Sequence, residues 1–194
     1  MTPNTPPRMV VVKKEEKEPK LRQLVLNGLS ALAQSSGSDI TVPVKLCLVA
    51  QSSLSPVARA VTALQAELAA AHVIARVIIT KAETVPLLQI GQGCTYRHLS
   101  DVRCYDAHEL LVLGSHVTWI GDCLRRDPAV RDSYELHTVA CAQTAKLVGL
   151  SFEKLWQLAA PFDASDERAA LAMAADLAGL PADASSRPTA LTRH

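Results

Sequence analysis

Two apolar runs decide the fold class: Val44-Lys45-Leu46-Cys47-Leu48-Val49-Ala50 and Val73-Ile74-Ala75-Arg76-Val77-Ile78-Ile79. The first run is nearly continuous, which is typical of a strand buried on both faces. The second is rich in β-branched residues and predicts another strand. Between them, Ser55 can cap a helix and Pro56 suits its first position. The helix itself is predicted by apolar residues at spacings of three and four: Val57, Val61, Leu64, Leu68 and Ala71. This order predicts a right-handed βαβ crossover, so the two strands should be parallel.

Further elements are predicted on both sides of this unit. Upstream, a helix is indicated by an apolar stripe at Leu21, Leu24, Val25, Leu29 and Leu32. Downstream, residues 81–100 show no regular pattern, and we expect a loop there. Two apolar stretches, 109–113 and 117–120, flank Gly114 and predict a hairpin. A strand over 134–140 and a helix over 141–160 should follow. The fold class is therefore α/β, with a mixed sheet and helices on both faces.

The predicted organisation is one globular unit with two tails. Residues 1–19 contain four prolines and a mixed-charge run, so we expect a disordered N-terminal arm. Residues 20–160 should form the α/β domain. In residues 161–194, the stretch from Ser165 to Leu177 predicts a helix, and a flexible tail follows Pro181.

Composition narrows the class of protein. The chain has 194 residues, is 48% hydrophobic, and carries a formal net charge of +1, which does not favour nucleic acid as a partner. Its apolar runs are too short to span a bilayer, and its N-terminus lacks a signal-peptide pattern. Its five cysteines are an odd number at scattered spacings. We therefore expect a reduced, cytoplasmic protein without disulfides.

The order of the elements between Val44 and Trp156 resembles one unit of the phospholipase D superfamily. That family has a βαβ unit, then a hairpin carrying H-x-K-x4-D-x6-G-S-x-N, an arginine-containing loop, a strand with a Glu, and a helix ending in F-x-x-L-W. The matching residues here are His108 before the hairpin, Gly121 after it, Arg125-Arg126, Glu135 and Phe152-Glu153-Lys154-Leu155-Trp156. The resemblance implies a single phospholipase D-like unit.

The resemblance also implies a site. It gives catalytic roles to His108 and Glu135, and phosphate or ligand contacts to Arg125, Arg126 and Asp122. The family's lysine, which neutralises phosphate charge, is missing here. If Gly121 is matched to the family glycine, the histidine falls on Ala107 and the lysine on Glu109. If one residue is deleted so that His108 takes the histidine role, the lysine falls on Leu110. Either register predicts a non-catalytic member of the superfamily that acts as a binding or assembly module.

Two alternatives remain open. The first is a metal-independent phosphodiesterase or nuclease that uses His108 from two subunits, with no cofactor. The second is a zinc-stabilised domain, because two C-x3-H pairs fall close together: Cys94, His98, Cys104 and His108. An extended segment from Cys104 to His108 would span ~13 Å, too far for both to reach one metal, so no metal ligand is assigned.

The resemblance further implies a homodimer, because active members place two such units face to face. The apolar strands 109–113 and 117–120 suggest an exposed patch on the hairpin for this contact. A covering role for the predicted helix 165–177 is the alternative. A phosphate-containing ligand or a partner protein is a further expected binding partner.

Overall fold

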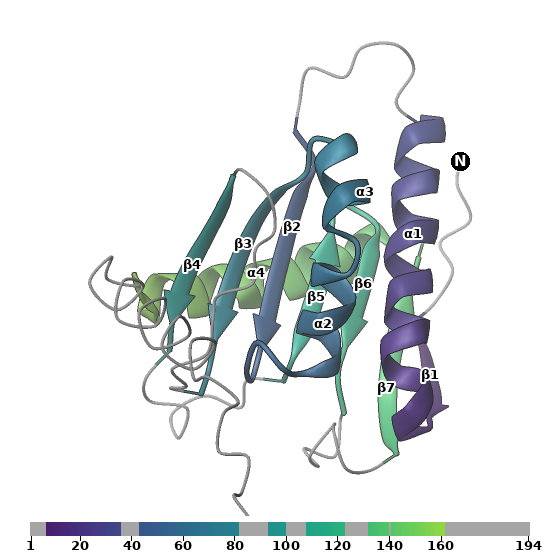
Figure 1. Ribbon diagram of the computed structural model, residues 1–194, viewed down its shortest axis with the longest axis horizontal. Helices are drawn as coiled ribbons and strands as arrows, with labels where there is room; N and C mark the ends of the chain where they lie inside the picture. Colours follow the sequence, from purple (N-terminus) through teal and green to yellow (C-terminus); the bar gives the residue numbers. More distant parts are fainter. Residues whose placement is uncertain are drawn as a thin grey trace, which may run out of the picture.

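The computed structural model describes one mixed β-sheet with helices on both faces (Figure 1). It describes residues 7–35, 43–81, 93–99, 108–122, 132–139 and 141–161. The strands are β1 (Arg8–Val12), β2 (Lys45–Ala50), β3 (Ile74–Ile79), β4 (Cys94–His98), β5 (Leu110–Leu113), β6 (Val117–Ile120), β7 (Ser133–Thr138) and β8 (Ala160–Pro161). The helices are the 3-10 turn η1 (Lys14–Glu16), then α1 (Lys17–Ser35), α2 (Pro56–Thr62), α3 (Gln65–Ala70) and α4 (Ala142–Leu158).

Within these residues, eight strands pair in the order β1-β7-β6-β5-β2-β3-β4-β8. Strands β2, β3 and β4 are parallel, which confirms the predicted βαβ crossover between β2 and β3. All the other pairings in the sheet are antiparallel. Helices α1, α2 and α3 cover one face of the sheet, and α4 crosses the other (Figure 1). The expected α/β class with a mixed sheet is therefore confirmed.

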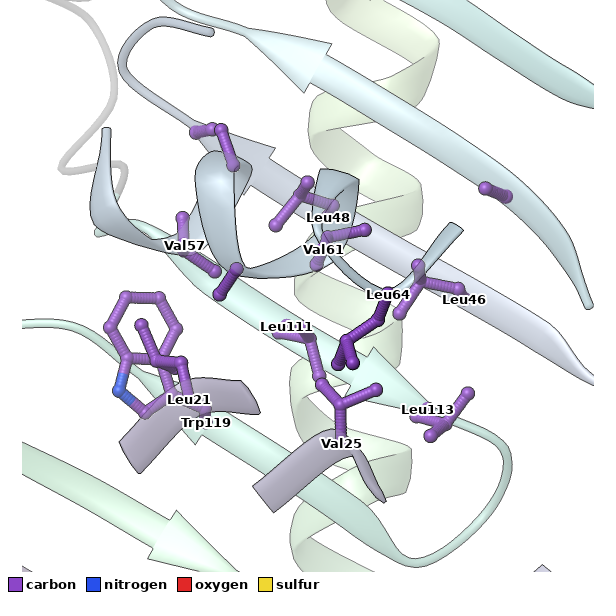
Figure 2. Close-up of a cluster of buried hydrophobic side chains, with 14 of the residues drawn as sticks. Leu21, Val25, Leu46, Leu48, Val57, Val61, Leu64, Leu111, Leu113 and Trp119 are labelled. Atoms are coloured by element: carbon purple, nitrogen blue, oxygen red, sulfur yellow. The ribbon is translucent and has the colours of Figure 1, made fainter. Parts of the chain in front are cut away.

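Each face of the sheet has its own apolar core. On the first face, Leu21 and Val25 of α1 and Val57 and Val61 of α2 share one apolar cluster with Leu48 of the sheet (Figure 2). On the second face, α4 packs over Val49, Ile78, Leu110 and Val112. The six side chains that the sequence pattern places most firmly in the core are all buried: Leu48, Val61, Leu64, Ile78, Phe152 and Trp156.

Trp156 also fastens α4 to the outer strands. The guanidinium groups of Arg76 on β3 and Arg97 on β4 lie 4.1 and 4.6 Å from its ring centroid. Arg97 donates hydrogen bonds to the carbonyl oxygens of Trp156 and Ala159, at 2.7 and 3.3 Å. These carbonyls belong to the last turn of α4, where no intrahelical donor remains. The end of the helix is thus capped by a strand residue.

Four expectations from the sequence need correction. Residues 8–12 do not belong to a disordered arm but form the edge strand β1, because Val12 is buried and Arg8–Val12 pair with β7. Residues 17–19 of the expected arm form the start of α1. The irregular region 81–100 contains β4, whose polar sequence gave no strand pattern. The helix after Ser55 is interrupted at Ala63 and Leu64, which separate α2 from α3.

The expected exposed patch on the hairpin is also wrong. Leu111 and Leu113 face α1 and α2, whereas Leu110 and Val112 face α4. All four are buried, as are Val117, Thr118 and Trp119 on β6. Both faces of the hairpin are covered, so it offers no apolar surface to a partner. The predicted strand at 102–105 and the predicted helix at 165–177 lie outside the described residues.

Candidate functional site

Several strands and one helix begin or end at one edge of the sheet. It is the edge where β2 ends, β5 begins, β6 ends and β7 begins, and where α1 starts (Figure 1). The carboxyl ends of parallel strands are the usual place for ligand sites in α/β sheets. His108 and Glu109 enter this edge just before β5, and Gly121 and Asp122 leave it just after β6.

A buried cluster of charged side chains lies at this edge, on the face covered by α1. It contains Lys17 from α1, Glu109, Asp122 and Glu135. Lys17 and Glu135 are each 1% exposed, and Glu109 and Asp122 are each 6% exposed. Such buried charges need partners, because isolated ions are poorly tolerated away from water. In the part of the chain that the structure describes, this cluster sets three carboxyl groups against one ammonium group.

Glu135 is the most firmly bound member of the cluster. Its carboxylate accepts hydrogen bonds from the Trp119 indole at 2.8 Å and from the Ser133 hydroxyl at 2.6 Å. The His137 ring nitrogen Nε2 lies 3.0 Å from the same carboxylate. Burial would raise the pKa of Glu135, but the hydrogen bonds from His137, Ser133 and Trp119 outweigh it and hold that pKa below 4.5. Glu135 is therefore an internal anion.

Glu109 has the opposite electrostatic balance. Burial raises its pKa above 4.5, although the Gln51 backbone N–H and the Ser55 hydroxyl favour the charged form. The N–H of Gln51, just after β2, donates to its carboxylate at 2.9 Å. The backbone carbonyl of Glu109 accepts from the Gly121 N–H at 2.8 Å. Glu109 thus connects the ends of β2 and β6 to the start of β5.

Lys17 supplies the positive charge. Burial lowers its pKa, and the negative charges of Glu135, Asp122, Glu109 and, last, Asp132 oppose that effect. Lys17 lies one helical turn before Leu21, on the same face of α1 as the apolar stripe. That position was the sequence signal for a buried lysine, but the surrounding mixed charges made the segment resemble a solvated arm.

The structure brings together some of the residues expected in the site. Asp122 and Glu135 are both in the buried cluster, and the Asp122 carboxylate accepts a hydrogen bond from the Tyr134 N–H at 3.1 Å. His108 is partly exposed, and its Nδ1 lies 3.2 Å from the backbone carbonyl oxygen of Asp122. Arg125 and Arg126 lie outside the described residues. Lys17 and Glu109 are the cluster members that were not predicted.

The register of the hairpin decides which residue stands at the family's lysine position. Leu110 points into the core beneath α4, on the opposite face from the charged cluster. Glu109 lies in the cluster. In the register without a deletion, the family's lysine position falls on Glu109. That register therefore places the lysine position among the charged groups, and the register with a deletion does not. A one-residue slip would turn every side chain of the strand to the other face.

The zinc alternative gains no support. Cys94 and His98 begin and end β4, and Cys104 lies outside the described residues. Strands β3 and β2 separate β4 from β5, so His98 and His108 are about 14 Å apart along the sheet edge. Among the described residues, no group of three or more His, Cys, Asp or Glu side chains could hold a metal ion. None of the described helices is long and apolar enough to cross a membrane.

Comparison with known proteins identifies the fold. No protein-family model matches the sequence, and no curated protein matches it. Among solved structures, the chain is similar to Nuc from Salmonella typhimurium, a phospholipase D family member, with 11% identity and a TM-score of 0.50, over 82% of this chain and 100% of Nuc. The architecture is therefore that of a single phospholipase D-like unit, as the sequence resemblance implied.

Two other solved structures are similar. TrmBL2, an archaeal chromatin protein whose structure shows a novel mode of DNA binding, has 12% identity and a TM-score of 0.51. That match covers 84% of this chain but 56% of the TrmBL2 chain. NucT from Helicobacter pylori has 13% identity and a TM-score of 0.49, over 81% of this chain and 99% of NucT. At these identities, the similarities to Nuc and TrmBL2 show the fold alone.

Removing the buried cation should destabilise the protein strongly. We expect Lys17→Met to lower the free energy of unfolding by about 3–5 kcal/mol, because buried carboxylates lose their counter-charge. Urea denaturation monitored by tryptophan fluorescence would measure the change. Lys20→Met on the same helix is the matched control and should change stability by less than about 0.5 kcal/mol. Equal effects of the two substitutions would contradict the role of Lys17.

The two glutamates should give stability an optimum in mildly acidic solution. The pKa of Glu109 is raised above 4.5, so the folded state takes up a proton before the unfolded chain does, and stability rises as the pH falls from neutrality. The pKa of Glu135 is held below 4.5, so the stability that its ionised form provides is lost as the pH falls further. Urea midpoints measured across this range should therefore peak between neutrality and about pH 4.5.

Glu109→Gln separates the two effects. It should remove the rise on the neutral side and leave the loss at acidic pH, because Glu135 is unchanged. A wild-type stability that increases steadily up to pH 7 would contradict the assignment to Glu109.

Proposed function

We propose that this chain is a non-catalytic phospholipase D-like module that acts by binding and assembly. The observation that carries this proposal is Glu109, which is buried among charged groups at the position where the resemblance asks for a lysine. A lysine there would neutralise the charge that builds up on a phosphodiester during the reaction. A carboxyl group at the same position cannot do so and repels the substrate when it is ionised.

The lysine that is present does not replace the missing one. Lys17 interacts electrostatically with Glu135, Asp122 and Glu109, so its charge already serves to balance carboxylates. It is also 1% exposed, which leaves its ammonium group no access to a ligand in solution. Glu135 is equally buried and accepts hydrogen bonds from Trp119 and Ser133. These groups form an internal network that stabilises the fold.

The absence of phosphodiesterase activity can be tested directly. The purified chain should not hydrolyse bis(p-nitrophenyl) phosphate or single-stranded DNA above background, with or without a chelator, because Glu109 offers no stabilisation to the transition state. The contrary outcome is chelator-resistant turnover that is lost in His108→Ala and kept in His116→Ala, whose histidine lies on the exposed β5–β6 turn. That outcome would establish the nuclease alternative. A loss in Arg125→Ala/Arg126→Ala would further assign the phosphate contact to arginine.

A homodimer is the form of assembly that we propose for this module. Met9 and Val11 on β1 are 62% and 56% exposed, and Tyr134, which pairs with Val11, is 41% exposed. Met9, Val11 and Tyr134 define the β1–β7 patch, an apolar surface on an edge strand pair that α4 leaves uncovered. Exposed apolar surface of this kind supports association with another protein surface. A formal net charge of +1 gives little electrostatic attraction for DNA, the ligand of TrmBL2.

Sedimentation velocity would test the dimer. The wild-type chain should sediment as a dimer, and Val11→Asp should shift it to a monomer, because a charge would be buried in the contact. Leu54→Asp is the matched control, since Leu54 is 60% exposed and lies outside the β1–β7 patch. A wild-type chain that remains monomeric at high concentration would refute the dimer.

A further inference from the structure

Strand β1 is an edge strand, at one end of the strand order. Among the described residues its one strand neighbour is β7. Natural edge strands usually carry charges, prolines or bulges that prevent pairing with another chain. From Met9 to Val12, β1 has no charge and no proline, and it pairs with β7 residue for residue. The outer side of β1, which faces away from β7, therefore lacks the usual protection against a further strand.

The hydrogen bonds of β7 show which residues of β1 face outward. The N–H of Tyr134 donates to the carboxylate of Asp122, just after β6, at 3.1 Å. Tyr134 therefore turns its backbone groups toward β6 and away from β1. Val11 stands opposite Tyr134, so these two residues form a pair without direct hydrogen bonds. Because the direction alternates along a strand, the N–H and C=O groups of Met9 and Val11 point to the outer side of β1.

A hydrogen bond at the end of β1 gives the same direction. The N–H of Lys14 donates to the carboxylate of Asp132, just before β7, at 3.0 Å. Lys13 is extended, so the alternation continues through it, and Val12 also turns its N–H toward β7. Val11, the residue before Val12, then faces outward.

The outer side of β1 is complementary to a second copy of itself in antiparallel orientation. With Val10 on a two-fold axis, Met9 stands opposite Val11 of the second copy. Both residues have outward backbone groups, so each such pair exchanges two N–H···O bonds. Arg8 stands opposite Val12, and no charge meets a like charge directly across the pairing.

Neighbouring registers are less favourable. A shift of two residues in one direction sets Arg8 against Lys14 of the second copy, and like charges directly opposite are destabilising. A shift of two residues in the other direction sets Val11 against Pro7, which has no N–H to donate. The sequence therefore favours the register centred on Val10.

The other end of the strand order does not offer a similar edge. Strand β8 has two residues, Ala160–Pro161, and its proline has no N–H. Short length and proline are common protections of edge strands. Pairing through β1 therefore joins two copies in a closed dimer with two-fold symmetry.

We infer that two copies of this chain join through the outer sides of their β1 strands and form one continuous sheet across a two-fold axis at Val10. The inference rests on the proposed homodimer and specifies its geometry. Main-chain hydrogen bonds of Met9 and Val11 hold the contact, and the side chains of these residues pack on each other across the axis. Tyr134 lies on β7, one strand further from the axis, so the contact does not depend on its side chain.

A disulfide would test the position of the axis. In an antiparallel pair without direct hydrogen bonds, the Cα atoms are ~4.5 Å apart, within disulfide range. Val10→Cys should therefore form a covalent dimer under mild oxidation, measured by non-reducing gel electrophoresis. Val11→Cys is the matched control, because position 11 is exposed but its two copies would lie ~8 Å apart. We expect at least about tenfold more covalent dimer from Val10→Cys than from Val11→Cys or the wild type.

Proline would test the main-chain hydrogen bonds. Val11→Pro removes an outward N–H, at a position where an edge strand tolerates proline, so the monomer should stay folded by circular dichroism. Its dimer dissociation constant, measured by sedimentation, should rise at least about tenfold, because a hydrogen bond is lost on each side of the axis. Val11→Ile keeps the N–H and should remain a dimer. Tyr134→Asp should also remain a dimer.

These results separate the edge-to-edge geometry from the dimer itself. A wild-type chain that stays monomeric at high concentration would refute both. The dimer would stand and the geometry would be overturned if Val10→Cys gave no more covalent dimer than Val11→Cys. A folded Val11→Pro variant that dimerises as well as the wild type would have the same meaning, as would dissociation by Tyr134→Asp, because the contact would then use the face of the β1–β7 patch. If Val11→Pro does not fold, the Val10→Cys result decides.

Discussion

The buried positive charge of Lys17 is the constraint on which one edge of the sheet depends, the edge where β2 ends and α1 starts. An ammonium group that is 1% exposed needs carboxylates close by, and they come from Glu135, Asp122 and Glu109. These residues belong to four separate segments of the chain. Glu109 is bound in turn to the end of β2, and Glu135 to Trp119 on β6. The network therefore sets how α1, β2, β5, β6 and β7 meet, and an error in any one of them would leave a charge without its partner.

This network also supports the proposal that the phospholipase D-like architecture works here without phosphodiesterase activity. In active members, positive charge at this edge would have to be available to a phosphate. In the cluster that the structure describes, the positive charge of Lys17 is enclosed, and the strand position that the resemblance assigns to lysine holds Glu109. The histidine that could act, His108, contacts only the backbone of Asp122 among the interactions described for it. The charged groups described at this edge therefore balance one another inside the protein, so the proposed binding role falls to the surfaces of the protein.

Those surfaces differ from the ones that the sequence pattern suggested. The hairpin strands are apolar because they are buried on both faces, between α1 and α2 on one side and α4 on the other. A continuous apolar run in a sequence cannot distinguish a strand with two covered faces from one with an exposed face. Only the position of α4 decides this. Most of the exposed large apolar residues in the described part of the chain lie instead on β1, β7 and the outer side of α4.

The sequence alone determined the βαβ unit, the hairpin, the helices α1 and α4 and their buried stripes, because local periodicity records which side of an element is covered. The phospholipase D-like architecture was implied by the resemblance in the order of the elements. It could not identify β1 or β4. Polar and charged residues surround β1, and β4 is itself polar, so pairing with a neighbouring strand determines both. It also could not show that Lys17 and Glu109 meet, since these residues are far apart in the chain. Such a pairing of charges is fixed by tertiary packing, in which the loss of water makes each buried ion depend on a partner from another element.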